Sequence, residues 1–467
     1  MTRRDLLSAS AALAAKSVAP AATPAPRKPN IVFIISDQFR ADALGCMRMS
    51  PMNLTPHLDS MARRGVLFRQ ATSNQPVCAP ARACMFTGQY PAQHGVWRNG
   101  LGLQPDTVTL AGVLRDQGYT ANYVGKWHLS AQTPTDHRNG AVPPASRGGF
   151  LDFWEGANAL ELTSHPFEGD MYDGDGNPLH FAGEYRADFL TQRAVRFLKE
   201  KRQQDRPFLL AVSYLEVHHQ NDVDLFVPPK KYAGKFDNPW VPQDLRPLPG
   251  SWPSQLPGYY GCVAAIDDAV GTLLACLRDE GLENDTIVVF TSDHACHFKT
   301  RNTEYKRSPH DSSIHIPLIL QGPGFDRALE LSELVGQVDL APTLLQAAGV
   351  AVPRTMQGRS VLPLLDRKTE GWRDEVYIEV SESLTGRALR TPQWSYAVAH
   401  PDRQKFSTQY HEYLLYDRFA DPFQHVNLAG RAESRDISAH LKERLLARIA
   451  EAGDPPPVIH PPFIPYV

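Results

Sequence analysis

The chain has 467 residues, of which 42% are hydrophobic and 21% charged, enough to bury one large α/β domain and a smaller one. This composition excludes a small disulfide-stapled scaffold and an intrinsically disordered protein. Because 48 Lys and Arg residues balance 51 Asp and Glu residues, for a formal net charge of -3, the chain is not a nucleic-acid-binding polycation.

The N-terminus predicts an export signal. Arg3 and Arg4 precede a weakly apolar stretch and then the small-residue site Ala19-Pro20-Ala21, an order typical of twin-arginine signals. We expect residues 1–24 to be a twin-arginine-type signal peptide, so that the twin-arginine export machinery delivers a periplasmic or secreted protein. The alternative is a frayed tail with a chance arginine pair. No stretch approaches the roughly 18 uncharged apolar residues of a membrane span, so none is expected.

The next segments alternate between strand and helix patterns. Residues 30–37 form a continuous β-branched run that ends in a carboxylate, as in a strand buried on both faces of a parallel sheet. Thr55 and Pro56 predict a helix through Arg64, with Thr55 accepting from its free N–H groups. The later expected elements are helix 110–117, strand 120–124, helix 185–201, strand 208–215, helix 259–279 and strands 286–292 and 316–320. This alternation predicts an α/β fold with a large, doubly wound, mostly parallel sheet.

The pattern changes around residues 362–373. Short strands are expected at 376–380, 395–399 and 413–416, followed by an amphipathic helix at 437–451 and a Pro-rich tail. We therefore predict a large domain over residues 29–372 and a smaller C-terminal domain, built on an antiparallel sheet, over residues 373–467.

The most specific motif surrounds one cysteine. The six cysteines have no CxxC spacing, which excludes a zinc ribbon and a thioredoxin motif. In the string Cys78-Ala79-Pro80-Ala81-Arg82, the cysteine starts a short apolar helix ended by Gly88. Cys78 is therefore expected at a helix N-terminus, where N–H groups favour an anion, and Arg82 lies one turn on.

Polar residues follow the predicted strands. Asp37 and Gln38 follow the first strand, and Asp293 and His294 follow a later one, so these four side chains should meet at one edge of the sheet. Such oxygen-rich ligation suits a hard divalent cation. Single aspartates at strand ends are more often caps, but a matched pair after two apolar strands is harder to dismiss.

Cationic residues also follow the strands. Lys126 and His128 point to the same side after strand 120–124, as an oxyanion site requires. A solvated lysine and a packed histidine are the alternative for that tetrapeptide alone. Further polar candidates follow later strands: His218, His219, Gln220, Asn221, Arg301, Lys306 and His310.

With these motifs, the sequence resembles the type I, formylglycine-dependent sulfatases of the alkaline-phosphatase superfamily, from about residue 30 to 428. The resemblance implies that residues 29–372 are a sulfatase catalytic domain. It also implies that a formylglycine-generating or sulfatase-maturing enzyme oxidises Cys78 to formylglycine, whose hydrate attacks sulfur, and that Arg82 steadies this residue. Ala81 stands where the family usually has serine.

The resemblance also implies roles for the other site residues. Asp37, Gln38, Asp293 and His294 would coordinate calcium together with the modified Cys78. Lys126, His128 and Lys306 would bind the sulfate, and His218 would protonate the leaving alcohol. The substrate-binding residues would be His219, Gln220, Asn221, Arg301 and His310, with Trp240 and Trp252 either stacking on a sugar or packing in a Pro-rich loop.

Three functions follow from the resemblance. The leading expectation is hydrolysis of sulfate esters on a sulfated sugar or polysaccharide. The pairing of Gln38 with His294 departs from the Asp and Asn of many sulfatases, and it resembles the phosphonate monoester and phosphodiester hydrolases of the same superfamily. The third hypothesis is a non-catalytic glycan-binding relative that kept the fold and the metal.

Overall fold

The computed structural model describes residues 27–131, 139–201 and 206–462, so the predicted signal peptide lies outside the described residues. Eleven of the described strands form one large sheet, in the order β11-β2-β10-β9-β1-β8-β3-β4-β6-β5, with β7 paired to β6. These strands are β1 (Asn30–Ser36), β2 (Val66–Thr72), β3 (Thr120–Lys126), β4 (Trp154–Ala157), β5 (Ser164–His165), β6 (Glu168–Tyr172), β7 (Pro178–Ala182), β8 (Phe208–Ser213), β9 (Thr286–Ser292), β10 (Leu318–Gln321) and β11 (Leu329–Gly336).

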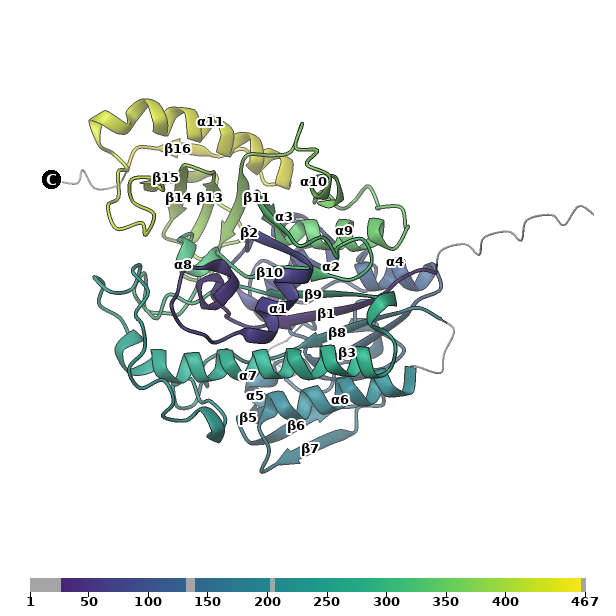
Figure 1. Ribbon diagram of the computed structural model, residues 1–467. Coiled ribbons are helices and arrows are strands. Elements are labelled where there is room, and N and C mark those ends of the chain that lie inside the picture. The colour runs from purple at the N-terminus through teal and green to yellow at the C-terminus, as the bar shows by residue number, and fades with distance from the viewer. Residues whose placement is uncertain (1–26, 132–138, 202–205, 463–467) are drawn as a thin grey trace, which may run out of the picture.

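Helices cover both faces of this sheet, as Figure 1 shows, with α6 and α7 below it and α2, α4 and α9 above it. The helices are α1 (Pro56–Arg64), α2 (Cys78–Thr87), α3 (Pro91–His94), α4 (Leu110–Asp116), α5 (Leu160–Thr163), α6 (Arg186–Lys201), α7 (Trp252–Asp279), α8 (Asp311–Ile314), α9 (Leu340–Ala347), α10 (Leu362–Leu365) and α11 (Arg435–Ala452). Strand β1 contributes side chains to the hydrophobic cores on both faces of the sheet. Val32 and Ile34 pack into one core, and Ile31, Phe33 and Ile35 pack into the other. The predicted α/β class is confirmed.

The centre of the sheet is parallel and in register. β1 pairs with β9 from Asn30↔Thr286 to Ser36↔Ser292, and with β8 as far as Ile35↔Ser213. β3 pairs in parallel with β8 on the other side. The carboxyl ends of β9, β1, β8 and β3 therefore lie together at one edge, where the polar residues that follow them can meet.

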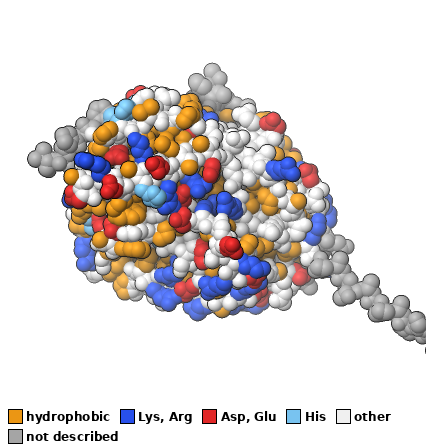
Figure 2. All heavy atoms as spheres, turned by 90° about the horizontal axis from the view of Figure 1, so that it is seen from above, with side chains coloured by type: hydrophobic (Ala, Val, Ile, Leu, Met, Phe, Trp, Pro, Cys, Tyr) orange, Lys and Arg blue, Asp and Glu red, His pale blue; other side chains and the backbone are white. Residues whose placement is uncertain are grey.

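A smaller sheet follows, in the order β12-β13-β14-β15-β16. Its strands are β12 (Val376–Val380), β13 (Thr385–Arg390), β14 (Trp394–His400), β15 (Gln409–Asp417) and β16 (Val458–His460). The first four are antiparallel, as expected, whereas β16 pairs in parallel with β15. Helix α11 covers this sheet (Figure 1). The face seen from above mixes basic, acidic and hydrophobic side chains, so neither sign of charge dominates it (Figure 2).

Two local expectations were wrong. Thr55 does not cap α1, because its hydroxyl accepts from the Gly45 N–H and donates to Asp59. The free N–H groups of His57 and Leu58 donate instead to the carboxylate of Asp267, on α7. The second error is the start of α7, which begins at Trp252 rather than 259 and contains Pro257.

Helix α7 is also the one helix among the described residues that is long and apolar enough to cross a membrane. However, 72% of its most apolar window is buried inside the protein. Its apolar surface therefore packs in the protein's own core.

Candidate active site

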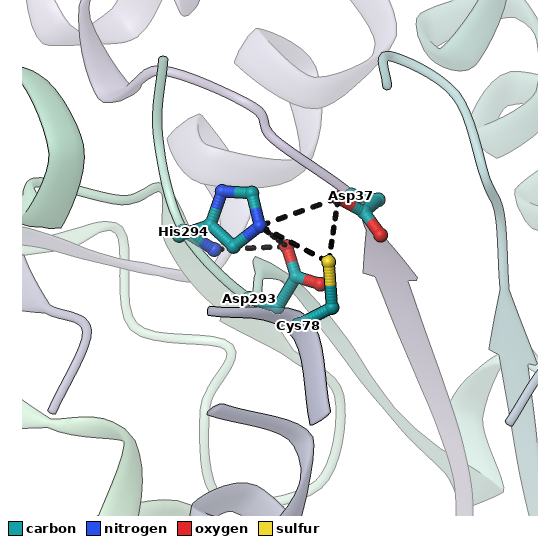
Figure 3. Close-up of side chains that lie close together, drawn as sticks. All are labelled: Asp37, Cys78, Asp293 and His294. Atoms are coloured by element: carbon teal, nitrogen blue, oxygen red, sulfur yellow. Dashed lines mark hydrogen bonds and ion pairs between the residues drawn. The ribbon is translucent and has the colours of Figure 1, made fainter. Parts of the chain in front are cut away.

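Four potential metal ligands converge where the sequence predicted them. Asp37 follows β1, Asp293 and His294 follow β9, and Cys78 is the first residue of α2. One ligand atom from each lies within 4.8 Å of the others, and all four residues are buried. Figure 3 shows the sulfur of Cys78 facing His294 and Asp37, at 3.4 Å from His294 Nε2 and 3.8 Å from Asp37 Oδ1.

The local sequence explains why Cys78 lies here. Val77 is extended, Cys78 opens the helix, and Gly88 ends it with φ 64°, in the left-handed region that glycine adopts without strain. The whole of α2 is buried, and the Cys78 side chain is 1% exposed. The short apolar helix thus fixes the sulfur beside the carboxylates.

The predicted set includes a fifth ligand, Gln38. Its Nε2 donates to the sulfur of Cys296 at 3.3 Å, while its Oε1 is buried without a hydrogen-bond partner. A buried amide oxygen without a partner is costly, and coordination of a cation would be one way to satisfy it. The site therefore fits a hard divalent metal, with the sulfur of Cys78 as its one soft donor.

Arg82 joins the two carboxylates. Its Nη2 donates to Asp37 Oδ2 at 3.3 Å and its Nε to Asp293 Oδ2 at 3.2 Å. Its Nη1 donates to Ser213 Oγ at 2.6 Å and to the carbonyl of Lys126 at 3.0 Å. Arg82 is fully buried, so its charge offsets part of the cost of two carboxylates placed side by side.

Two lysines supply positive charge near the sulfur of Cys78. Lys126 Nζ lies 2.8 Å from Asp37 Oδ2. Lys306 Nζ donates to Cys78 Sγ at 2.9 Å and lies 3.3 Å from His218 Nε2. Burial alone would raise the pKa of the Cys78 thiol, but Lys126, Lys306 and His294 outweigh it and hold that pKa well below its usual value. The centre therefore favours an anion.

The pKa values of the two carboxylates, Asp37 and Asp293, are shifted in opposite directions. Burial and Cys78 act to raise the pKa of Asp37, but Lys126, His218 and Lys306 hold it below its ordinary value. Burial and the neighbouring Asp37 raise the pKa of Asp293. Two buried carboxylates at this distance disfavour each other's ionisation, and a bound cation would remove that conflict.

One charged neighbour of the site, Glu161, was not predicted from the sequence. It lies on α5, with Oε1 3.1 Å from Lys126 Nζ and 3.6 Å from His128 Nδ1. Burial opposes its ionisation, but Lys126 and His128 lower the pKa of Glu161 to about 2. A single glutamate in a four-residue helix carries no motif, so only the fold reveals it.

A close approach of two strands aims Lys126 at the site. Gly125 has φ 106°, and a Cβ on it would lie 2.0 Å from the carbonyl oxygen of Ser213 on β8. Only glycine allows β3 to approach β8 so closely. His128 follows with φ 61°.

The predicted substrate residues divide into two groups. His219 stacks between His218 and Tyr305, with ring centroids 4.4 and 4.1 Å apart, and is followed by the buried Gln220 and the exposed Asn221. Arg301 and His310 face the C-terminal part of the chain instead. Arg301 donates to the carbonyls of residues 423 and 424, and His310 lies 3.1 Å from the Tyr416 hydroxyl. Trp252 Nε1 donates to the carbonyl of residue 248, within its own segment.

Comparisons with known proteins match most of the chain to sulfatases. A family model described as Sulfatase matches residues 29–350, and one described as N-sulphoglucosamine sulphohydrolase, C-terminal, matches residues 303–451. The chain is 31% identical over 447 residues to an ulvan-active sulfatase of Formosa agariphila, covering 92% of this chain and 82% of that protein.

Solved structures share the whole architecture. A putative sulfatase of Bacteroides fragilis superposes with a TM-score of 0.80 at 26% identity, covering 94% of this chain and 98% of that one. A protein solved in complex with its substrate D-glucosamine-2-N,6-O-disulfate superposes with a TM-score of 0.73 at 23% identity, covering 91% and 98%. The chain belongs to the sulfatase family, within the alkaline-phosphatase superfamily, and is a sulfatase.

Proposed function

We propose that this sulfatase hydrolyses sulfate esters of a sulfated sugar or polysaccharide, with formylglycine made from Cys78 as nucleophile and calcium as its metal. The observation that carries the proposal is the position of Cys78, whose sulfur lies within reach of a metal-ligand cluster and accepts a hydrogen bond from Lys306. When present, the hydrated aldehyde supplies a nucleophilic oxygen and the calcium ion supplies positive charge to the sulfate oxygens.

The donor set supports both groups together. Asp37, Asp293 and Gln38 offer hard oxygen donors, and Gln38 Oε1 lacks a protein partner. A sulfur donor suits soft metals, whereas calcium prefers oxygen. Replacement of the sulfur of residue 78 by oxygen would complete an oxygen-rich set, with His294 as its nitrogen donor.

The two lysines, Lys126 and Lys306, bind the negatively charged sulfate oxygens of the substrate. A sulfate ester resists attack because its oxygens carry negative charge, so the site must place cations on them. Lys126 is fully buried, and Lys306 is 4% exposed. In such a dry setting each ammonium acts more strongly than it would in water. Together they hold the sulfate group of the substrate next to residue 78.

Two histidines move the protons. His218 Nδ1 lies 2.5 Å from the carbonyl of His219 and therefore donates to it. Its Nε2, 3.3 Å from Lys306 Nζ, is the atom at which a proton passes to the leaving alkoxide. His128 is among the groups that lower the pKa of Cys78, and we assign to it the proton that residue 78 releases when sulfate leaves. Glu161, close to His128 Nδ1, stabilises the imidazolium that results.

The burial of Cys78 constrains its maturation. A side chain that is 1% exposed in the folded protein is out of reach of another enzyme. The formylglycine-generating or sulfatase-maturing enzyme must therefore act before the chain folds. We propose that modification precedes twin-arginine export, and that the mature protein is periplasmic or secreted.

We propose a carbohydrate substrate because of the substrates named for similar proteins. One relative is named an ulvan-active sulfatase, and a solved protein of the same fold holds a disulfated glucosamine as its substrate. Next to His218, the half-buried His219 and the exposed Asn221 offer polar groups to the hydroxyls of a sugar.

A phosphonate monoester or phosphodiester hydrolase is the second candidate, favoured by Gln38 and His294 among the ligands. Turnover of an aryl sulfate and of an aryl phosphonate by the same preparation separates the two. We expect the sulfate to be the better substrate and Cys78→Ser to lose multiple turnover, because a serine ester cannot eliminate sulfate as an aldehyde hydrate does. Preference for the phosphonate, or wild-type multiple turnover in Cys78→Ser, would contradict the proposal.

A further inference from the structure

A separate cavity of about 340 Å³ lies between the large sheet and the C-terminal part of the chain. Its lining comes chiefly from the segment after β1, from β2, from the loop 240–244, from α8, from the end of β13 and from residues 418–424. Cys78, both site lysines and His218 are not among the lining residues. Ala295, which lines it, directly follows His294 of the metal cluster, so the cavity and the cluster share one chain segment.

The cavity is lined by residues with polar atoms that have no hydrogen-bond partner. Arg390 Nη1, Arg418 Nε, Ser312 Oγ and Asp244 Oδ2 are all buried and unpaired. Arg390 is 1% and Ser312 7% exposed. Each such group costs free energy unless something satisfies it. Together they offer three donors and one acceptor to a ligand.

Positive and negative side chains lie at different ends of the cavity. Asp311 accepts from Arg390 Nε and Nη2 at 2.8 Å and from Arg418 Nη2 at 3.0 Å, so one carboxylate faces two guanidinium groups. Arg40, in contrast, pairs with both Asp42 and Asp244. The Arg390 end of the cavity is therefore net positive, and the Asp244 end is net negative with a free acceptor oxygen.

Apolar side chains form the remaining wall. Trp240 and Phe423 both line the cavity and are partly buried. An aromatic face beside a few fixed polar groups is the usual composition of a site for a sugar ring. The positive end would receive an acidic substituent of the ring, and Asp244 would accept from a hydroxyl group.

We propose that this cavity binds an acidic sugar residue, carrying a carboxylate or a sulfate, of the glycan whose sulfate ester is cleaved at Cys78. The inference rests on the proposed carbohydrate substrate. It assigns the recognition of a second, non-reacting unit to Arg390, Arg418, Ser312 and Trp240. The enzyme would then prefer chains with acidic groups on neighbouring units.

The test is a binding titration of the full-length protein, followed by NMR, with glucuronic acid, glucose 6-sulfate and glucose as probes. We expect one or both acidic sugars to bind and glucose to bind much more weakly, and the stronger acid identifies the substituent. Ser312→Ala should weaken acid binding about tenfold, because it removes a donor that has no partner in the protein. Trp240→Ala should weaken the binding of acidic sugars further.

Ser313→Ala is the matched control, because its hydroxyl is also buried and unpaired but does not line the cavity. Equal binding of all three sugars, no binding, or equal effects of the two serine variants would overturn the inference. Aryl sulfate turnover by the same preparations is the separate measure of the proposed function. Its absence in the wild type would overturn the proposed function while leaving the titration valid.

Discussion

The ion pair between Arg186 and Glu216 offers the sharpest test of how the fold holds the site. Arg186 lies on α6, with Nε 3.0 Å and Nη2 2.9 Å from Glu216 Oε1, and the two side chains are 0% and 1% exposed. The backbone carbonyl of Glu216 accepts from Ser36 Oγ at 2.8 Å and from the Asp37 N–H at 3.3 Å. Glu216 therefore ties the segment that carries His218 to the end of β1.

We predict that Glu216→Gln lowers the free energy of unfolding by about 3–5 kcal/mol, because it leaves the buried guanidinium of Arg186 without a counter-charge. The loss is large against a total stability of about 5–15 kcal/mol. Turnover at a temperature where the variant stays folded should fall as well, since His218 loses its anchor. Urea unfolding and aryl sulfate kinetics measure the two effects.

The matched control is Asp279→Asn, which removes an exposed ion pair with Arg278, 63% and 66% exposed. It should change stability by less than about 1 kcal/mol. If Glu216→Gln is no more destabilising than this control, the buried pair does not hold the segment as argued.

Three further predictions concern charge and metal. Lys306→Met should lower kcat about 10²–10³-fold while the protein stays folded, because it removes the donor nearest residue 78; a loss below about tenfold would count against its role. Chelation of divalent ions should lower the midpoint of thermal unfolding and abolish turnover, and calcium should restore both; an unchanged midpoint would argue against a structural metal at the Asp37 cluster. Burial opposes ionisation of Asp311, but Arg390 and Arg418 hold its pKa below the usual carboxyl range. Its stabilising effect is therefore present above about pH 4 and lost as the pH falls, so Asp311→Asn should show a flatter loss of stability in acid; equal slopes would refute this.

The central sheet was predictable because its strands are continuous apolar runs of residues. β1, β8 and β9 are buried along nearly their whole length, so their patterns stand out and their carboxyl ends had to meet. Strands β5, β6 and β7 escaped prediction because they are short and only one residue of each is buried, so they show few apolar positions. The prediction that Thr55 caps α1 was wrong because the carboxylate of Asp267, distant in sequence, accepts from the free N–H groups at the start of this helix.

Some residues of the candidate site could also be predicted from the sequence, and others could not. Asp37, Asp293 and His294 could be predicted from strand ends, and Cys78 from the start of a helix. Glu161 could not, because its nearness to Lys126 depends on how α5 packs after β4. The cavity beside Arg390 was equally hidden, since its walls come from segments hundreds of residues apart.

The most direct test of the central claim is the mass of the tryptic peptide from Gln70 to Arg82, which contains Cys78, from protein isolated from its native host. We predict a peptide in which the cysteine has lost its sulfur and carries an aldehyde. An unmodified thiol in fully active enzyme would contradict the formylglycine mechanism and leave the cysteine itself as the nucleophile.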